Sequence, residues 1–195
     1  MSTATSPATT WGAAAVLGLV SVVVLVGGAM SLDVTPVGGP PAGTPSDTRD
    51  ATPFTGASGG CTVSDPTGTG GCVTPATAWL LQQASAHFGR QPTSCWDAHA
   101  WNPTSDHPKG RGCDVTFGTA GRFPGEDDKA AGWVFATWLV SNAKALHVSY
   151  VIWQGQIWST ARAGEGWRTY TGGGVYDPTS PVGGHYDHIH VSVLP

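Results

Sequence analysis

The chain has 195 residues, a net charge of −4 and only 11% charged residues. Its few Lys and Arg residues form no basic cluster, so we do not expect a nucleic acid as a partner. The length allows one folded domain with additional segments, and the sequence contains no internal repeat.

The N-terminal part divides into three segments. Residues 1–11 form a short tail without Lys or Arg, and residues 12–32 form an apolar run of about 21 residues, long enough to cross a membrane as a helix. We favour a transmembrane anchor here over a cleaved signal segment, because a signal peptide normally begins with basic residues. Residues 33–60 are rich in Pro, Gly and Thr, which predicts a flexible linker. The folded domain is then expected over residues 61–195.

All four cysteines follow the apolar run, at positions 61, 72, 95 and 113. An even number of cysteines beyond a membrane segment indicates disulfides and an extracytoplasmic domain, either anchored or secreted. Three pairings are possible; we favour Cys61–Cys72 and Cys95–Cys113. The alternative is four free thiols in a cytosolic domain.

The domain begins with a predicted helix. Thr74 is a suitable N-cap, Pro75 suits the first helical position, and Gly89 ends the pattern after Phe88. A second helix is expected over about residues 128–146, and two strands around Gly155 form a predicted hairpin. The strands are expected at residues 93–96, 114–117, 148–154, 156–159, 167–170 and 188–194. We therefore predict an α+β fold with a small antiparallel sheet and two main helices.

Two short segments carry most of the candidate chemistry. His107 and Asp114 lie seven positions apart, and His188 and His190 follow about seventy residues later. Residues two apart on a strand point the same way, so His188 and His190 are expected to share a face. Two imidazoles and one carboxylate form a three-ligand zinc site that leaves one position for water, as in catalytic sites, and we expect this zinc site on the sheet. Taken singly, such histidines are more often polar residues on an exposed strand.

A catalytic zinc site also needs a base, and Asp187 is the candidate. His185 or His188 would then stabilise the developing oxyanion. Asp187 precedes His188 on the expected strand and would point away from the histidines, unless the strand begins irregularly. The preceding Gly183-Gly184 favours such an irregular entry.

The loop before the first motif contains further candidates. His99 could line the cleft, and Trp96 and Trp101 could form a wall for substrate, although core packing is the more common role of tryptophan. Five other tryptophans are expected in the core: Trp133, Trp138, Trp153, Trp158 and Trp167.

These motifs resemble those of a known group of zinc enzymes. The first is similar to the S-x-H-x-x-G-x-A-x-D motif of the zinc D-Ala-D-Ala carboxypeptidases, which are grouped with lysostaphin-type endopeptidases and the Hedgehog amino-terminal domain. It reads Ser105-x-His107-x-x-Gly110-x-Gly112-x-Asp114, and the second motif reads His185-x-Asp187-His188-x-His190. The resemblance covers about residues 73–193 and extends to actinobacterial extracytoplasmic domains of this type. It implies His107, Asp114 and His190 as zinc ligands, Asp187 as base and His185 as a supporting group.

The resemblance implies a peptidase that hydrolyses amide bonds of peptidoglycan peptides, as a carboxypeptidase or an endopeptidase. We expect a monomer that is held at the membrane by its N-terminal helix. Active carboxypeptidases of the group usually carry an Arg upstream of the first ligand, and residues 93–97 here contain none; Arg90, Arg111 or His99 are the available substitutes. The alternative is a catalytically inactive, zinc-stabilised module that binds the cell wall. A secreted hydrolase for another amide is a third reading.

Overall fold

The computed structural model describes residues 50–57 and 59–195. The predicted tail 1–11, the apolar segment 12–32 and residues 33–49 of the predicted linker lie outside the described residues. Within the described part of the chain, no helix has the length and apolar character needed to cross a membrane.

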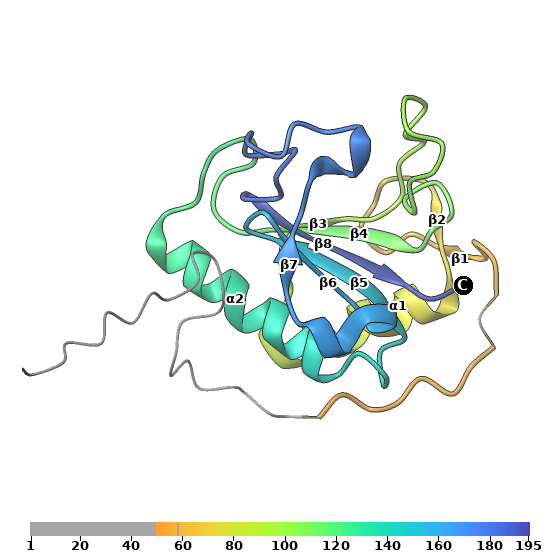
Figure 1. The fold of residues 1–195 in the computed structure, drawn as a ribbon. Coiled ribbons are helices and arrows are strands. Elements are labelled where there is room, and N and C mark those ends of the chain that lie inside the picture. Colours follow the sequence, from red (N-terminus) through yellow and green to blue (C-terminus); the bar gives the residue numbers. More distant parts are fainter. Residues whose placement is uncertain (1–49, 58) are drawn as a thin grey trace, which may run out of the picture. The chain divides into compact units, whose positions relative to one another are not determined.

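The domain combines two helices with a six-stranded antiparallel sheet, as the sequence predicts (Figure 1). Along the sheet the strand order is β3-β4-β8-β5-β6-β7, so the last strand of the chain lies in the middle. The elements are β1 (Val63–Ser64), β2 (Cys72–Val73), α1 (Pro75–Phe88), β3 (Thr93–Ser94), β4 (Gly112–Thr116), α2 (Glu126–Ser141), β5 (Val148–Trp153), β6 (Gln156–Ser159), β7 (Arg168–Thr169) and β8 (His188–Val193), with short 3₁₀ segments η1 (Thr160–Glu165) and η2 (Gly172–Gly174). The β1–β2 pair forms a separate sheet that the sequence did not predict.

Local sequence signals explain where the helices begin and end. The backbone N–H of Thr77 donates to Thr74 Oγ1 at 3.2 Å, and Gly89 takes a positive φ of 74° after α1, so both predicted ends are confirmed. Helix α2 ends at Ser141, earlier than expected. The Asn142 side chain donates to the carbonyl of Trp138 at 3.0 Å and accepts from the N–H of Ala51 at 2.7 Å. It thereby closes the helix end and ties Ala51, which belongs to the predicted linker, onto the domain.

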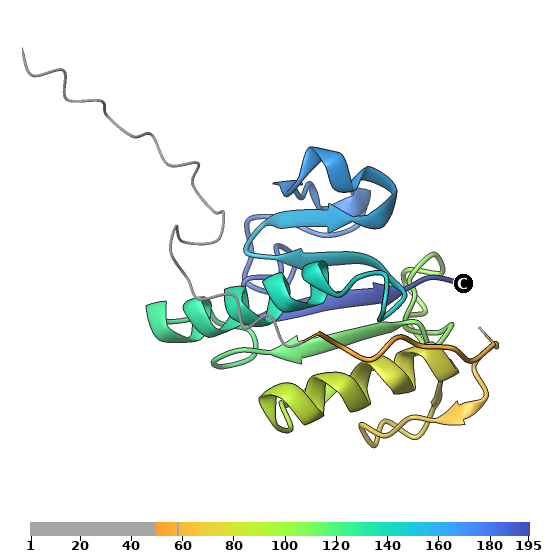
Figure 2. The ribbon, with the colours of Figure 1, turned by 90° about the horizontal axis from the view of Figure 1, so that it is seen from below.

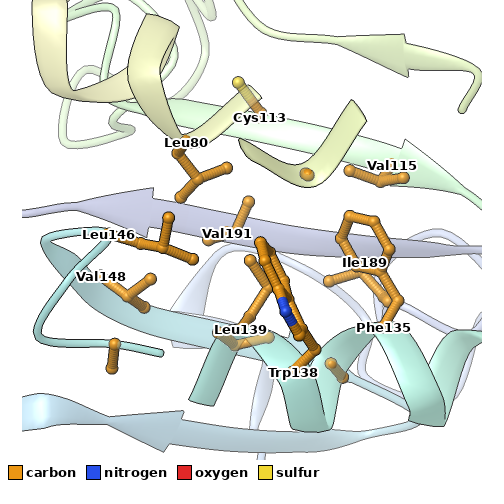
Figure 3. Packing of buried hydrophobic residues seen from close by; sticks show 14 of the residues in the cluster. Leu80, Cys113, Val115, Phe135, Trp138, Leu139, Leu146, Val148, Ile189 and Val191 are labelled. Carbon is orange, nitrogen blue, oxygen red and sulfur yellow. The ribbon is translucent and has the colours of Figure 1, made fainter. Parts of the chain in front are cut away.

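The two faces of the sheet have different roles. Both helices lie against one face, as Figures 1 and 2 show, and the side chains of Ile189 and Val191 from β8 point into the core between them (Figure 3). The residues that alternate with them along β8 therefore point to the opposite face: His188, His190 and Ser192. That face is covered by the segments that precede β4 and β8 rather than by a helix (Figure 1). The tryptophans assigned to the core are buried or packed against it.

Both expected disulfides are present. Cys61 pairs with Cys72, and Cys95 pairs with Cys113. Cys113 lies on the helix side of β4, behind Asp114, and both Cys95 and Cys113 are buried. This bond therefore ties the start of the 95–111 loop to the strand that carries Asp114.

Loss of the Cys95–Cys113 bond should destabilise the domain more than loss of Cys61–Cys72. The bond links residues 18 positions apart, for which chain entropy alone predicts about 3 kcal/mol, and replacing buried sulfurs leaves a cavity in addition. We expect Cys95→Ala/Cys113→Ala to lower the free energy of unfolding by at least this amount in urea titrations. Cys61→Ala/Cys72→Ala is the matched control, and a larger loss in that variant would contradict the assignment.

A buried carboxylate anchors the same loop from the other side. Asp65 accepts hydrogen bonds from the Thr67 and Trp96 backbone N–H groups at 2.7 and 2.8 Å, and from the hydroxyls of Thr67 and Thr69. Burial alone would raise the pKa of Asp65, but these donors outweigh it and lower the pKa.

Asp65→Asn should therefore destabilise the domain in a pH-dependent way. Because the pKa of Asp65 is lower in the folded state, its stabilising effect is present above its unfolded pKa of about 3.9 and is lost as the pH falls. At pH 7 we expect a loss on the order of 1–3 kcal/mol in urea unfolding, with a smaller difference from wild type at pH 3. An equal difference at both pH values would refute this account.

Candidate metal centre

Three side chains that the sequence singles out as ligands meet on the face of the sheet opposite helices α1 and α2, here called the open face. Asp114 on β4 lies directly opposite His190 on β8, and Asp114 Oδ1 is 2.8 Å from His190 Nδ1. The loop before β4 brings His107 Nε2 to 3.4 Å from the same oxygen. One donor atom from each of the three residues lies within 4.8 Å of the others. The cluster could therefore bind a metal ion.

The remaining nitrogens of the two histidines have other partners. His107 Nδ1 is hydrogen-bonded to the carbonyl of Cys95, and His190 Nε2 lies 3.0 Å from Ser192 Oγ. Metal-binding histidines are commonly oriented in this way, with the second ring nitrogen bound to a carbonyl or hydroxyl group. The donor set and its supporting bonds thus fit a metal ion.

Close packing holds this geometry in place. The ring of Tyr150 stacks on His190 with centroids 5.3 Å apart, and its hydroxyl donates to Asp106 at 3.2 Å. A Cβ atom on Gly112 would lie only 3.1 Å from the backbone nitrogen of His107 and 3.2 Å from His190 Cε1. Glycine at this position therefore lets the loop that carries His107 approach the sheet closely.

The charges of the cluster are unevenly distributed. Burial alone would raise the pKa of Asp114, but hydrogen bonds to His107 and His190 outweigh it and hold the pKa well below its usual range. Burial opposes protonation of His107 as well, yet its bond to Asp114 raises the pKa of that imidazole. Asp114 is therefore an ionised carboxylate that attracts a cation, and metal binding at the cluster would compete with protonation of His107.

Asp187 lies beside the cluster but reaches it through a histidine. Asp187 Oδ1 is 2.7 Å from His188 Nδ1, and its Oδ2 accepts from the N–H of Gly121 at 2.5 Å. The side chain is nearly fully buried and does not line the pocket above the cluster. His188 does line that pocket, and its Nε2 is 3.8 Å from Asp114 Oδ1. The geometry is therefore a carboxylate–histidine pair in which only the imidazole faces the cluster.

His185 lies beside His188 and His190. It has a positive φ of 56°, and its backbone is held by the β5–β6 turn, where Gln154 N donates to its carbonyl at 2.9 Å. Its ring lies 4.7 Å from that of His188 and 5.8 Å from that of His190. Burial, followed by the neighbouring His188 and His190, lowers the pKa of His185 to about 3, so this imidazole is neutral. The entry to β8 after Gly183-Gly184 is irregular, but Asp187 turns toward His188 and Gly121 rather than into the pocket.

A pocket of about 360 Å³ lies above the cluster, between the 95–111 loop and the segment 170–187. Asn102 Nδ2 donates to the hydroxyl of Tyr176 at 3.1 Å and links the two segments. Trp101 lines the pocket and is 64% exposed, whereas Trp96 lies elsewhere and packs on Gly71. His99 also lines the pocket, with its Nδ1 2.7 Å from Ser105 Oγ and its ring 4.7 Å from that of His107.

Sequence reasoning did not identify several residues of this pocket. Tyr150 and Ile152 come from β5 and point to the open face, while Tyr170 and Tyr176 come from the segment before β8. The alternation of β5 would place Tyr150 and Ile152 on one face, but no local signal places β5 next to β8.

Comparison with known protein families shows a match over part of the chain. Residues 69–181 match the family described as VldE, C-terminal domain. The chain belongs to this family. The match covers more than half of the chain and includes His107 and Asp114, but it ends before β8. No curated protein and no solved structure matches the chain.

The metal cluster can be tested directly. We expect the purified domain to bind one zinc ion per chain, and we expect His107→Ala, Asp114→Asn or His190→Ala to weaken binding by at least 100-fold, because each removes a ligand. Calorimetric titration with zinc measures the affinity. His147→Asn, remote from the cluster, removes an imidazole at a position with a positive φ that Asn tolerates, and should bind zinc as the wild type does. Equal binding by all variants would exclude this site.

Proposed function

We propose that the protein is an extracytoplasmic, zinc-dependent peptidase that hydrolyses amide bonds of peptidoglycan peptides, as a carboxypeptidase or an endopeptidase. The single observation that carries the proposal is the Asp187–His188 pair beside a three-residue metal cluster, all next to one pocket. The motif resemblance supports the choice of peptidoglycan peptides, and the two disulfides support a location outside the cytoplasm.

Zinc held by His107, Asp114 and His190 would polarise the substrate carbonyl and make a bound water more acidic. His188 Nε2 faces the same cluster and is placed to accept the proton that the attacking water loses. As the C–N bond breaks, that proton passes to the departing amine. Asp187 then acts as a positioning residue, because its bond to Nδ1 orients the ring and stabilises the protonated imidazole.

His185 has a separate role in this mechanism. It is neutral, and a neutral imidazole carries one N–H that can donate to the carbonyl oxygen as negative charge develops there. Its ring packs edge-on against the ring of Tyr170, with centroids 5.0 Å apart, and this packing holds it at the wall of the pocket. This proposal divides the three predicted catalytic residues into a proton acceptor (His188), its positioning carboxylate (Asp187) and an oxyanion donor (His185).

The proposal predicts a graded loss of activity. Zinc-loaded wild-type protein should release new amino groups from purified peptidoglycan, measured by amine labelling and mass spectrometry. His188→Ala should lower kcat by about 10²- to 10⁴-fold, the usual contribution of general acid–base catalysis. Asp187→Asn should lower it by roughly 10- to 100-fold, as expected for a group that acts through another. Both variants should still bind zinc.

The catalytically inactive wall-binding module makes a different prediction. It is favoured by the lack of Lys or Arg among the described residues that line the pocket, since a charged substrate end would have no counterion there. A zinc-loaded protein that sediments with peptidoglycan but releases no amines would establish this alternative over the peptidase. Turnover of an unrelated amide, with none on peptidoglycan, would instead establish a hydrolase for another substrate.

A further inference from the structure

The pocket above the cluster has an unusual lining for a site that would bind a peptide end. Among its described lining residues, Asp114 is the only carboxylate, and there is neither Lys nor Arg. The remaining polar groups are imidazoles, phenols, hydroxyls and one carboxamide. A free C-terminal carboxylate one residue beyond the scissile bond would enter this pocket without a guanidinium or ammonium partner, which proteins normally supply for such a group.

The neighbouring cations are engaged elsewhere. Arg111 Nη2 lies 2.5 Å from Asp106 Oδ1, and the side chain is mostly buried in that ion pair. Lys109 Nζ is 3.5 Å from the same carboxylate oxygen and donates to the Thr104 carbonyl at 2.9 Å. Arg90 lines a separate pocket beside α1, together with the core residues Leu80 of α1 and Phe135 of α2. Of the three groups that the sequence offered as a substrate clamp, only His99 lies in the pocket.

The rim of the pocket is apolar where a clamp would be expected. Trp101 is 64% exposed, Val175 50% and Val182 53%, and all three line this pocket. They come from the two segments between which the pocket lies. Exposed apolar side chains grouped at one site favour contact with an uncharged ligand. An extended chain passing over the cluster would contact these side chains through its backbone and small side chains.

We propose that the site acts on internal amide bonds of uncharged peptide segments and discriminates against a free carboxylate next to the scissile bond. This inference rests on the proposed peptidase function and selects its endopeptidase form. In the reaction, water adds its oxygen to the carbonyl carbon, the C–N bond breaks and the departing amine takes the proton. The departing group is thus the remainder of a peptide chain rather than a single terminal amino acid.

A matched pair of substrates tests this inference. Two alanine-containing stem-type peptides are incubated with the zinc-loaded protein. They differ only in the residue after the scissile bond, which ends in a free carboxylate in one peptide and in a carboxamide in the other. We expect kcat/KM to be at least 10-fold higher for the carboxamide, mainly through a lower KM, because the carboxylate is desolvated without a partner. In parallel, mass spectrometry of digested peptidoglycan should show cleavage within cross-linked peptides rather than loss of terminal residues.

Two variants make the test specific. Val182→Lys places an ammonium group at the exposed rim and should reduce the preference for the carboxamide several-fold, as a ratio of kcat/KM values. Arg90→Ala removes a cation outside the pocket and should leave the ratio unchanged. Equal or faster cleavage of the carboxylate peptide would overturn the inference but leave the peptidase function standing. If neither peptide nor peptidoglycan is cleaved although zinc is bound, both are overturned.

Discussion

The position of β8 between β4 and β5 is the constraint on which both the core and the site depend. Successive residues of a strand point to opposite faces, so this one strand supplies Ile189 and Val191 to the core and His188 and His190 to the site. Its antiparallel register with β4 sets His190 directly opposite Asp114. A shift of one residue would expose the apolar side chains and bury the histidines among the helices, so the hydrophobic core fixes the geometry of the cluster.

The parts of this arrangement that local patterns determine could be predicted from the sequence. The cap at Thr74, the hairpin at Gly155 and the alternation at residues 188–190 each act within a few positions, and the structure has all three. Of the three disulfide pairings that the sequence allows, the structure has the favoured one, which joins cysteines adjacent in sequence order. The end of α2 was predicted too late because Asn142 is held by the distant Ala51, a contact that no periodicity reveals.

The site was predictable as a set of residues but less so as an arrangement. The motifs identify His107, Asp114 and His190, because their chemistry and spacing are specific, and the structure brings them together. The orientation of Asp187 depends on Gly121, which lies in a segment without a motif. The N–H of Gly121 donates to one carboxylate oxygen of Asp187. The pocket walls depend on strand order and on long loops, so residues such as Tyr176 could not be assigned from spacing alone.

The charges around the cluster connect these observations. Asp114 is held ionised by the histidines around it, and Asp187 stabilises a proton on His188 one step further away. Burial opposes ionisation of both Asp114 and Asp187. Hydrogen bonds with imidazoles, and for Asp187 also the N–H of Gly121, outweigh this effect and lower the pKa of each carboxyl group. Lys109 and Arg111 of the neighbouring loop form ion pairs with Asp106 instead, which also accepts a hydrogen bond from the Tyr150 hydroxyl. Two of the domain's cations, Lys109 and Arg111, thus support the loop. The described residues that line the pocket include no Lys or Arg, and the histidines and the carboxylate among them favour a metal ion.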